Sequence, residues 1–158
     1  MKDISFRYAE ACDTPLILDF IRKLAAHQKL TKQMVANEEL LRKWIFEEKR
    51  AEVIFCIYRG KEVGFAVFYH NFSTLLGRSG IHLEDLYVEP EYRGHGCGKA
   101  LLCKLAKITR ERDCGRLDWC CLDWNRESVE FYLSLGAMPL EGWTIYRLSG
   151  DALQRLKN

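Results

Sequence analysis

The chain has 158 residues, of which 48% are hydrophobic and 29% charged, and its formal net charge at pH 7 is +2. This length and composition predict a globular protein with one domain and its own core. The near-neutral charge argues against a dedicated nucleic-acid-binding or membrane-binding protein, in which basic residues would predominate. The longest apolar runs, such as residues 65–69, are far too short to span a bilayer, and we expect no signal peptide at the N-terminus.

The seven cysteines indicate a reducing, cytoplasmic environment. Their number is odd and no two have C-x-x-C spacing, so we expect neither a disulfide framework nor a zinc site. The triplet at residues 95–97, His-Gly-Cys, lacks the partners that a metal site would need. We therefore expect no metal, and most cysteines are interpreted as small core residues.

The first half of the chain predicts a strand, two helices and a hairpin. Residues 4–8 alternate like a strand, and Asp13 followed by Pro15 is typical of the start of a helix. The apolar residues of this helix recur at helical spacing: Leu16, Ile17, Phe20, Ile21 and Leu24. A second helix is expected from Asn37, with a buried face of Leu40, Leu41, Trp44 and Ile45. Two strands, 51–58 and 62–71, flank the turn at 59–61 and indicate a hairpin.

The second half alternates strands with helices. We expect a strand over 81–88, a helix over about 98–112, a strand over 117–122, a helix from Asn125 to Leu135, and a last strand over 145–148. This order predicts one α/β domain over residues 1–158, with a mixed central β-sheet flanked by helices.

A glycine-rich stretch, YRGHGCGKALL at residues 92–102, lies between a predicted strand and a predicted helix. A P-loop would need glycine at 93 and Ser or Thr at 100, where the chain has Arg93 and Ala100. A dinucleotide fingerprint would need glycine at 99, where Lys99 stands. The pattern R-x-x-G-x-G is met, and it suits a pyrophosphate, because bare backbone amides and a helix N-terminus then point at the same anion.

Three further motifs accompany this stretch: HLEDLYV before it, and LDWN and FYLSLGA after it. With these motifs the chain resembles the GNAT superfamily of acetyl-CoA-dependent N-acetyltransferases, and within it the spermidine/spermine (diamine) acetyltransferase group. The similarity extends from FRYAEACD to EGW and is strongest over residues 83–136. It implies a GNAT fold, in which a splayed pair of parallel strands holds the cofactor, and it implies a homodimer, in some relatives with exchanged C-terminal strands.

The resemblance also implies the residues that bind acetyl-CoA. The backbone of the first splayed strand would hold the pantetheine, and the glycine loop would hold the pyrophosphate. Two residues of the later helix match positions that contact the cofactor from the other side, although Asn125 is equally well explained as a helix cap. The full set is Leu86, Tyr87, Val88, Arg93, Gly94, His95, Gly96, Cys97, Gly98, Lys99, Asn125 and Ser128.

The resemblance assigns two catalytic roles. Glu84 matches a general base that acts through water, and Tyr132 matches a general acid near the thioester sulfur. A core role for Tyr132 is the alternative, since Val129, Tyr132 and Leu133 share helical spacing. Because adjacent side chains in a strand point to opposite faces, Glu84 and Asp85 are expected to have different roles. No cysteine is expected to act as a nucleophile, so transfer to the amine is direct.

The acceptor is expected to be the primary amine of a small polyamine, diamine or lysine-like molecule. Glu84, Asp85 and Glu141 supply acids for its pocket, whereas His27 and Gln28 stand where polyamine enzymes have a tyrosine–glutamate pair. This loss of an acid makes spermidine and spermine less favoured. Three other functions stay open: acetylation of a protein N-terminus or an antibiotic amine, an acyl-CoA-binding sensor without turnover, and a nucleotide-binding module. We expect neither nucleic-acid nor membrane partners.

Overall fold

The structure, a computed structural model, describes residues 3–156. Its strands form a five-stranded sheet in the order β1-β2-β3-β4-β5. The strands are β1 Ile4–Tyr8, β2 Glu52–Tyr58, β3 Lys61–Ser73, β4 Arg78–Val88 and β5 Leu117–Trp119. Successive strands from β1 to β4 pair antiparallel, and β5 pairs parallel with β4. The mixed sheet and the parallel pair predicted from the sequence are therefore confirmed.

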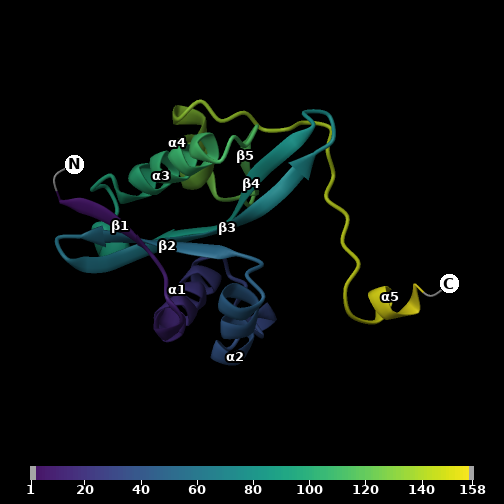
Figure 1. Cartoon of the computed structure of the whole chain (residues 1–158), viewed down its shortest axis with the longest axis horizontal. Helices are drawn as coiled ribbons and strands as arrows, with labels where there is room; N and C mark the ends of the chain where they lie inside the picture. Colours follow the sequence, from purple (N-terminus) through teal and green to yellow (C-terminus); the bar gives the residue numbers. More distant parts are fainter. Residues whose placement is uncertain (1–2, 157–158) are drawn as a thin grey trace. The chain divides into compact units, whose positions relative to one another are not determined.

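The chain divides into two compact units, one ending at Cys120 and one beginning at Cys121. The first unit holds the sheet, the α-helices α1 Thr14–His27, α2 Glu38–Leu41 and α3 Cys97–Glu111, the 3-10 turns η1 Ala11–Asp13, η2 Thr31–Gln33 and η4 Pro90–Tyr92, and the π-helical turn η3 Arg42–Glu47. In Figure 1, α1 and α2 lie on one side of the sheet and α3 lies on the other. The second unit holds α4 Arg126–Ser134 and α5 Gly150–Arg155.

A cluster of aromatic rings fixes α1 against the sheet. Phe20 is 1% exposed, and its ring centroid lies 5.3 Å from that of Phe65 and 5.9 Å from that of Tyr87. On the other face, Leu101 and Leu105 of α3 are fully buried. Burial of this apolar surface is the main stabilising term, and it holds the middle of β3 and β4 between two helical layers.

Three expectations about secondary structure and burial are corrected. The second helix begins at its Asn37 cap as predicted, but it is α-helical only to Leu41, and Leu40 and Trp44 are 41% and 47% exposed. Residues 145–148 form no strand, because they have no ladder partner among residues 3–156. Only two of the seven cysteines, Cys56 and Cys97, are buried; the others lie in turns, at element ends or on the outer side of α3.

Among the residues described, no helix is both long and apolar enough to cross a membrane.

Candidate functional site

The parallel pairing of β4 with β5 stops in the middle of β4. The last paired residues are Leu83 and Trp119, whereas β4 continues to Val88. Residues 85–88 keep their antiparallel partners on β3 but have no ladder partner on the other side within the described sheet. Backbone N–H and C=O groups along this edge are available to a ligand, because a strand edge presents unpaired donors and acceptors.

A β-bulge marks the point where the pairing stops. Asp85 pairs with Val67, but Leu83 pairs with Phe68, so Glu84 is the extra residue. Side chains two apart in β3 share a face, and Asp85 and His82 lie opposite Val67 and Tyr69. The bulge therefore puts Asp85 and His82 on the same face of the sheet, and Glu84 reaches that face too, since its carboxylate lies 3.9 Å from Nε2 of His82.

The prediction that Glu84 and Asp85 point to opposite faces is thus corrected. Strict alternation applies only to a regular strand, and the extra residue interrupts it here. Both carboxylates therefore lie on the α1 face of the sheet.

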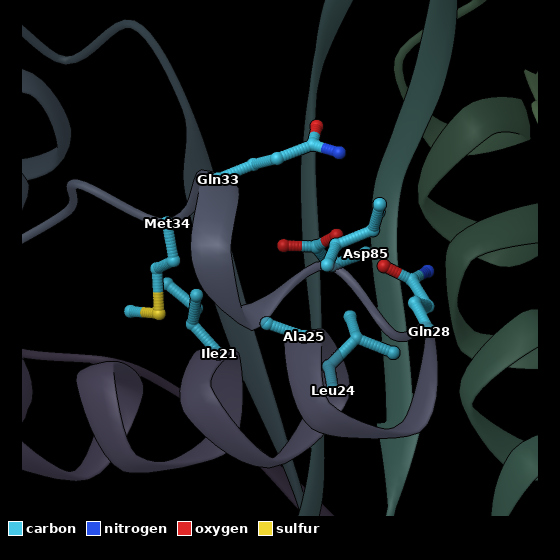
Figure 2. Close-up of a pocket in the computed structure, with 8 residues that line it drawn as sticks. Ile21, Leu24, Ala25, Gln28, Gln33, Met34 and Asp85 are labelled. Atoms are coloured by element: carbon cyan, nitrogen blue, oxygen red, sulfur yellow. The ribbon is translucent and has the colours of Figure 1, made fainter.

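A pocket of about 210 Å³ lies on this face between β4, α1 and the chain after α1. Figure 2 shows the Asp85 carboxylate among the labelled side chains, with Leu24 and Ala25 on one side and Gln33 on the other. The walls are mostly apolar, and the polar lining consists of Gln28, Gln33 and Asp85. The complete lining is Ile21, Leu24, Ala25, Gln28, Leu30, Gln33, Met34 and Asp85.

Asp85 is the charged group of this pocket. Burial, and after it the neighbouring charge of Glu84, raises the pKa of Asp85 to about 6. An ammonium ion entering the pocket would offset both effects, because an opposite charge favours the carboxylate. The pocket is therefore suited to a group that carries a positive charge.

Glu84 is more open, with 56% of its side chain exposed. Its neighbours on the α1 face are His82 and Tyr69, whose rings lie 5.1 Å apart between centroids. Burial, and then the charge of Glu84, raises the pKa of the Tyr69 hydroxyl. The Glu84 carboxylate is thus exposed to solvent and lies beside the His82 ring.

The glycine-rich loop follows β4 and ends at α3. Gly94 and Gly96 have φ values of +76° and +84°, in the left-handed region that glycine adopts without strain. Gly96 is the N-cap of α3 and provides no side-chain cap, so the first amides of this helix keep their hydrogen-bonding capacity. A Cβ atom added at either glycine would meet open space, so backbone conformation, rather than crowding, requires glycine here.

The side chains of the loop have different roles. Arg93 donates from Nε to the Val88 carbonyl at 3.1 Å, which ties the loop to the end of β4. Nδ1 of His95 lies 3.1 Å from the Arg93 carbonyl oxygen. Cys97 is 1% exposed and contacts the buried Cys56 thiol, whose pKa is raised to about 12, first by burial and then by Cys97. Of Cys97, only the backbone amide is available to an anion, whereas Lys99 is exposed.

The remaining predicted site residues belong to the second unit. Asn125 caps α4 by accepting a hydrogen bond from the Ser128 amide at 3.3 Å, so its structural role is shown. Burial raises the pKa of Tyr132 to about 12, and Cys121 adds to the shift. Glu141 is exposed in a turn.

The acceptor residues predicted at the end of α1 differ in position. Gln28 lines the pocket with Asp85, whereas His27 is exposed and is not part of the lining. Gln33 and Met34 were not predicted from the sequence, because they lie in and just after the short turn η2, which has no periodic pattern. His82 was not predicted either, although alternation alone places it on the same face as Glu84.

Replacing Asp85 by Asn is expected to change the pH dependence of stability. With a pKa near 6 in the folded protein and near 3.8 when unfolded, Asp85 favours folding most below pH 4, and this contribution is lost as the pH rises through 6. Asp85→Asn should therefore stabilise the protein by about 2–3 kcal/mol at pH 8 and by little at pH 4. Urea denaturation at both pH values measures the change in the free energy of unfolding. Asp151→Asn is the control, because Asp151 is exposed. Equal effects of Asp85→Asn at both pH values would contradict the argument that burial raises the pKa of Asp85.

Comparison with known proteins agrees with this geometry. The model of the Acetyltransferase (GNAT) family matches residues 18–137. Thialysine N-epsilon-acetyltransferase of Bos taurus is 36% identical, and the alignment covers 99% of this chain and 98% of that protein. Spermidine/spermine N(1)-acetyltransferase-like protein 1 of Homo sapiens is 31% identical over 97% of this chain and 24% of that protein.

Among solved structures, an integron cassette protein from V. cholerae superimposes with a TM-score of 0.80 at 27% identity, and the match covers 98% of this chain and 97% of that one. The matched residues 18–137 include most of α1 and all of the pocket lining, β4 with its bulge, and the glycine loop with α3. The chain therefore belongs to the acetyltransferase (GNAT) family.

Proposed function

We propose that the protein transfers an acetyl group from acetyl-CoA directly to the primary amine of a small, lysine-like acceptor. The observation that carries this proposal is the edge of β4 at residues 84–88. An acidic pocket opens at its beginning and a bare helix N-terminus follows its end. Acetyl-CoA has a pyrophosphate, an arm that contains amides, and a terminal thioester. These groups match the helix N-terminus, the open strand edge and the region beside the acidic pocket, in that order.

The residues present fit acetyl-CoA. The amides at the start of α3, with Arg93 and Lys99 beside them, form a site for a pyrophosphate, because helix N-termini favour anions. Leu86, Tyr87 and Val88 would hold the pantetheine arm through their backbone groups, although the Val88 carbonyl already accepts a hydrogen bond from Arg93. When bound, acetyl-CoA supplies the activated acyl group; the chain supplies position, charge and proton transfer.

Deprotonation of the acceptor is the first demand on the protein. An alkylamine with a lysine-like pKa of about 10.4 is neutral in only about one molecule in 2,500 at pH 7, and only the neutral form is a nucleophile. A carboxylate beside the amine both attracts the ammonium ion and removes its proton. We assign the removal to Glu84, directly or through a water molecule, because its side chain is open to solvent beside the pocket.

We assign the protonation of the leaving thiolate to Tyr132. A thiolate with a pKa of about 8.5 is a weaker base than a tyrosinate. Because the pKa of Tyr132 is raised to about 12, full proton transfer is uphill, and the hydroxyl acts mainly by donating a hydrogen bond as charge develops on sulfur. A raised pKa also keeps the hydroxyl protonated over the whole physiological pH range.

The pocket lining supports a lysine-like acceptor over a polyamine. Its described lining contains one carboxylate, Asp85, and two amides, Gln28 and Gln33. One carboxylate matches one ammonium group, and amides both donate to a carboxylate and accept from an ammonium ion. An amino acid with a side-chain amine, such as thialysine, carries both groups, whereas spermidine and spermine carry only cations. The similarity to thialysine N-epsilon-acetyltransferase supports the same choice.

The function is tested by measuring the release of free CoA from acetyl-CoA in the presence of one amine at a time. The amines are thialysine, lysine, putrescine, spermidine and a short peptide. We expect thialysine to give the highest kcat/KM. Tyr132→Phe should lower kcat about 100-fold, as expected for loss of an acid–base group. A thermal-shift titration should show unchanged CoA binding by this variant and no stabilisation of the protein by ATP or NAD. Release of CoA with none of these amines, or stabilisation by ATP alone, would contradict the proposal.

Gln28→Glu tests the proposal that the pocket prefers an acceptor with one ammonium group. A second carboxylate next to Asp85 should favour acceptors with several cations, since charge complementarity sets the preference. We expect the ratio of kcat/KM for spermidine to that for thialysine to rise about 10-fold, or about 1.4 kcal/mol. His27→Glu is the matched control, because His27 neighbours Gln28 but lies outside the pocket lining. An equal rise in both variants would show that general surface charge is responsible.

We further propose a cytoplasmic homodimer. Seven free cysteines without a disulfide among the described residues support a reducing compartment. A dimer is what the family resemblance implies. Residues 145–148 have no ladder partner within the described chain, so this segment is available to pair with a second copy. Light scattering at micromolar concentration should give twice the 18.5 kDa chain mass. A mass of one chain would refute the dimer.

A further inference from the structure

A polar cluster lies beside Glu84 on the same face of the sheet, outside the acceptor pocket. Its centre is the His82 ring, 20% of which is exposed. Nδ1 of His82 lies 3.5 Å from Oδ1 of Asp118, and Nε2 lies 3.9 Å from Oε2 of Glu84. The imidazole thus lies between two carboxylates, one on β5 and one at the bulge of β4.

The carboxylate of Asp118 is held by two other donors. Asn71 donates from Nδ2 to Oδ1 at 3.0 Å, and Nε of Arg116 lies 3.0 Å from Oδ2. A carboxylate fixed 3.5 Å from Nδ1 would favour the tautomer with the proton on Nδ1. Nε2 would then carry a lone pair on the side of Glu84.

The groups that face His82 come from three strands. Tyr69 and Asn71 lie on β3, Glu84 on β4 itself, and Asp118 on β5, with Arg116 just before it. Among the described residues, no group of three His, Cys, Asp or Glu side chains is arranged to hold a metal ion. The arrangement is that of an oriented base next to an exposed carboxylate.

We propose that His82, oriented by Asp118, is a positioning residue that relays the acceptor proton away from Glu84. This inference rests on the proposed function. In the first step the N–H bond of the acceptor ammonium breaks and an O–H bond forms on Glu84. In the second step that O–H bond breaks and an N–H bond forms on Nε2, which gives an imidazolium ion beside Asp118. The imidazolium then releases this proton to solvent, to which the ring is 20% exposed, and returns to the neutral form.

The relay has a physical reason. Transfer of the proton to Nε2 returns the Glu84 carboxylate to its charged form, and the new imidazolium lies between two carboxylates that stabilise its charge. The separation of 3.9 Å exceeds a hydrogen bond, but Glu84 is exposed and its side chain rotates within nanoseconds. A charged Glu84 is needed before the next acceptor ammonium binds.

His82→Gln is the central test, because glutamine keeps hydrogen-bonding capacity but does not titrate. With acetyl-CoA and thialysine, we expect kcat to fall about 10- to 100-fold, while KM for acetyl-CoA changes less than about twofold. Asp118→Asn should give a smaller fall in kcat. His70→Gln is the matched control, since His70 lies on the neighbouring strand, is exposed, and points to the opposite face from Tyr69.

A double-mutant cycle separates a relay from a structural role. If His82 acts through Glu84, His82→Gln should lower kcat less than about twofold in a Glu84→Gln background, because the two losses are then not additive. An equal loss in both backgrounds would overturn the relay. An unchanged kcat for His82→Gln, measured when the wild-type protein is active, would also overturn the relay.

The tautomer of His82 is measured without turnover. Nitrogen-15 NMR of the wild type should show the proton on Nδ1, and Asp118→Asn should lose this preference. A proton on Nε2 in the wild type would overturn the pairing with Asp118. If the wild-type protein transfers an acetyl group to no amine, the proposed function itself fails. If the wild type is active and the His82→Gln variant is equally active, only the relay fails.

Discussion

The architecture depends on one interruption of hydrogen bonding, the point in β4 where the parallel ladder to β5 ends while the antiparallel ladder to β3 continues. A strand that keeps only one neighbour retains a fixed shape and also presents backbone groups to a ligand. The aromatic cluster around Phe20 supports this stretch from one side and α3 supports the sheet from the other. The structure can leave this edge open because the core does not rely on it.

The bulge at Glu84 adds chemistry to that edge. In a regular strand, two adjacent acids would be separated by the sheet, and only one could meet the acceptor. The extra residue brings Glu84 and Asp85 to one face but in different surroundings. Asp85 is enclosed by apolar side chains, which makes it a partner for a bound cation, and Glu84 stays exposed, which suits it to exchange protons. In the function we propose, one backbone irregularity therefore separates binding of the acceptor from transfer of its proton.

Much of this organisation was predictable from the sequence. Helical spacing of apolar residues located α1, and the glycines at 94 and 96 indicated a loop in which only glycine is free of strain. The acids at 84 and 85 were singled out, but the bulge was not foreseen, because a register shift depends on the partner strand. The pocket residues Gln33 and Met34 lie in a segment whose path is set by tertiary packing. The strand expected at 145–148 was wrong, since strand propensity cannot supply a pairing partner.

The burial of Cys97 also bears on sensitivity to oxidation. Oxidation of a cysteine to a sulfinic or sulfonic acid places negative charge on its side chain, and susceptibility rises with exposure. In this fold the loop turns the Cys97 side chain inward against Cys56 and presents only its amide outward. The burial therefore protects the loop from gaining negative charge at the place where we propose that an anion binds.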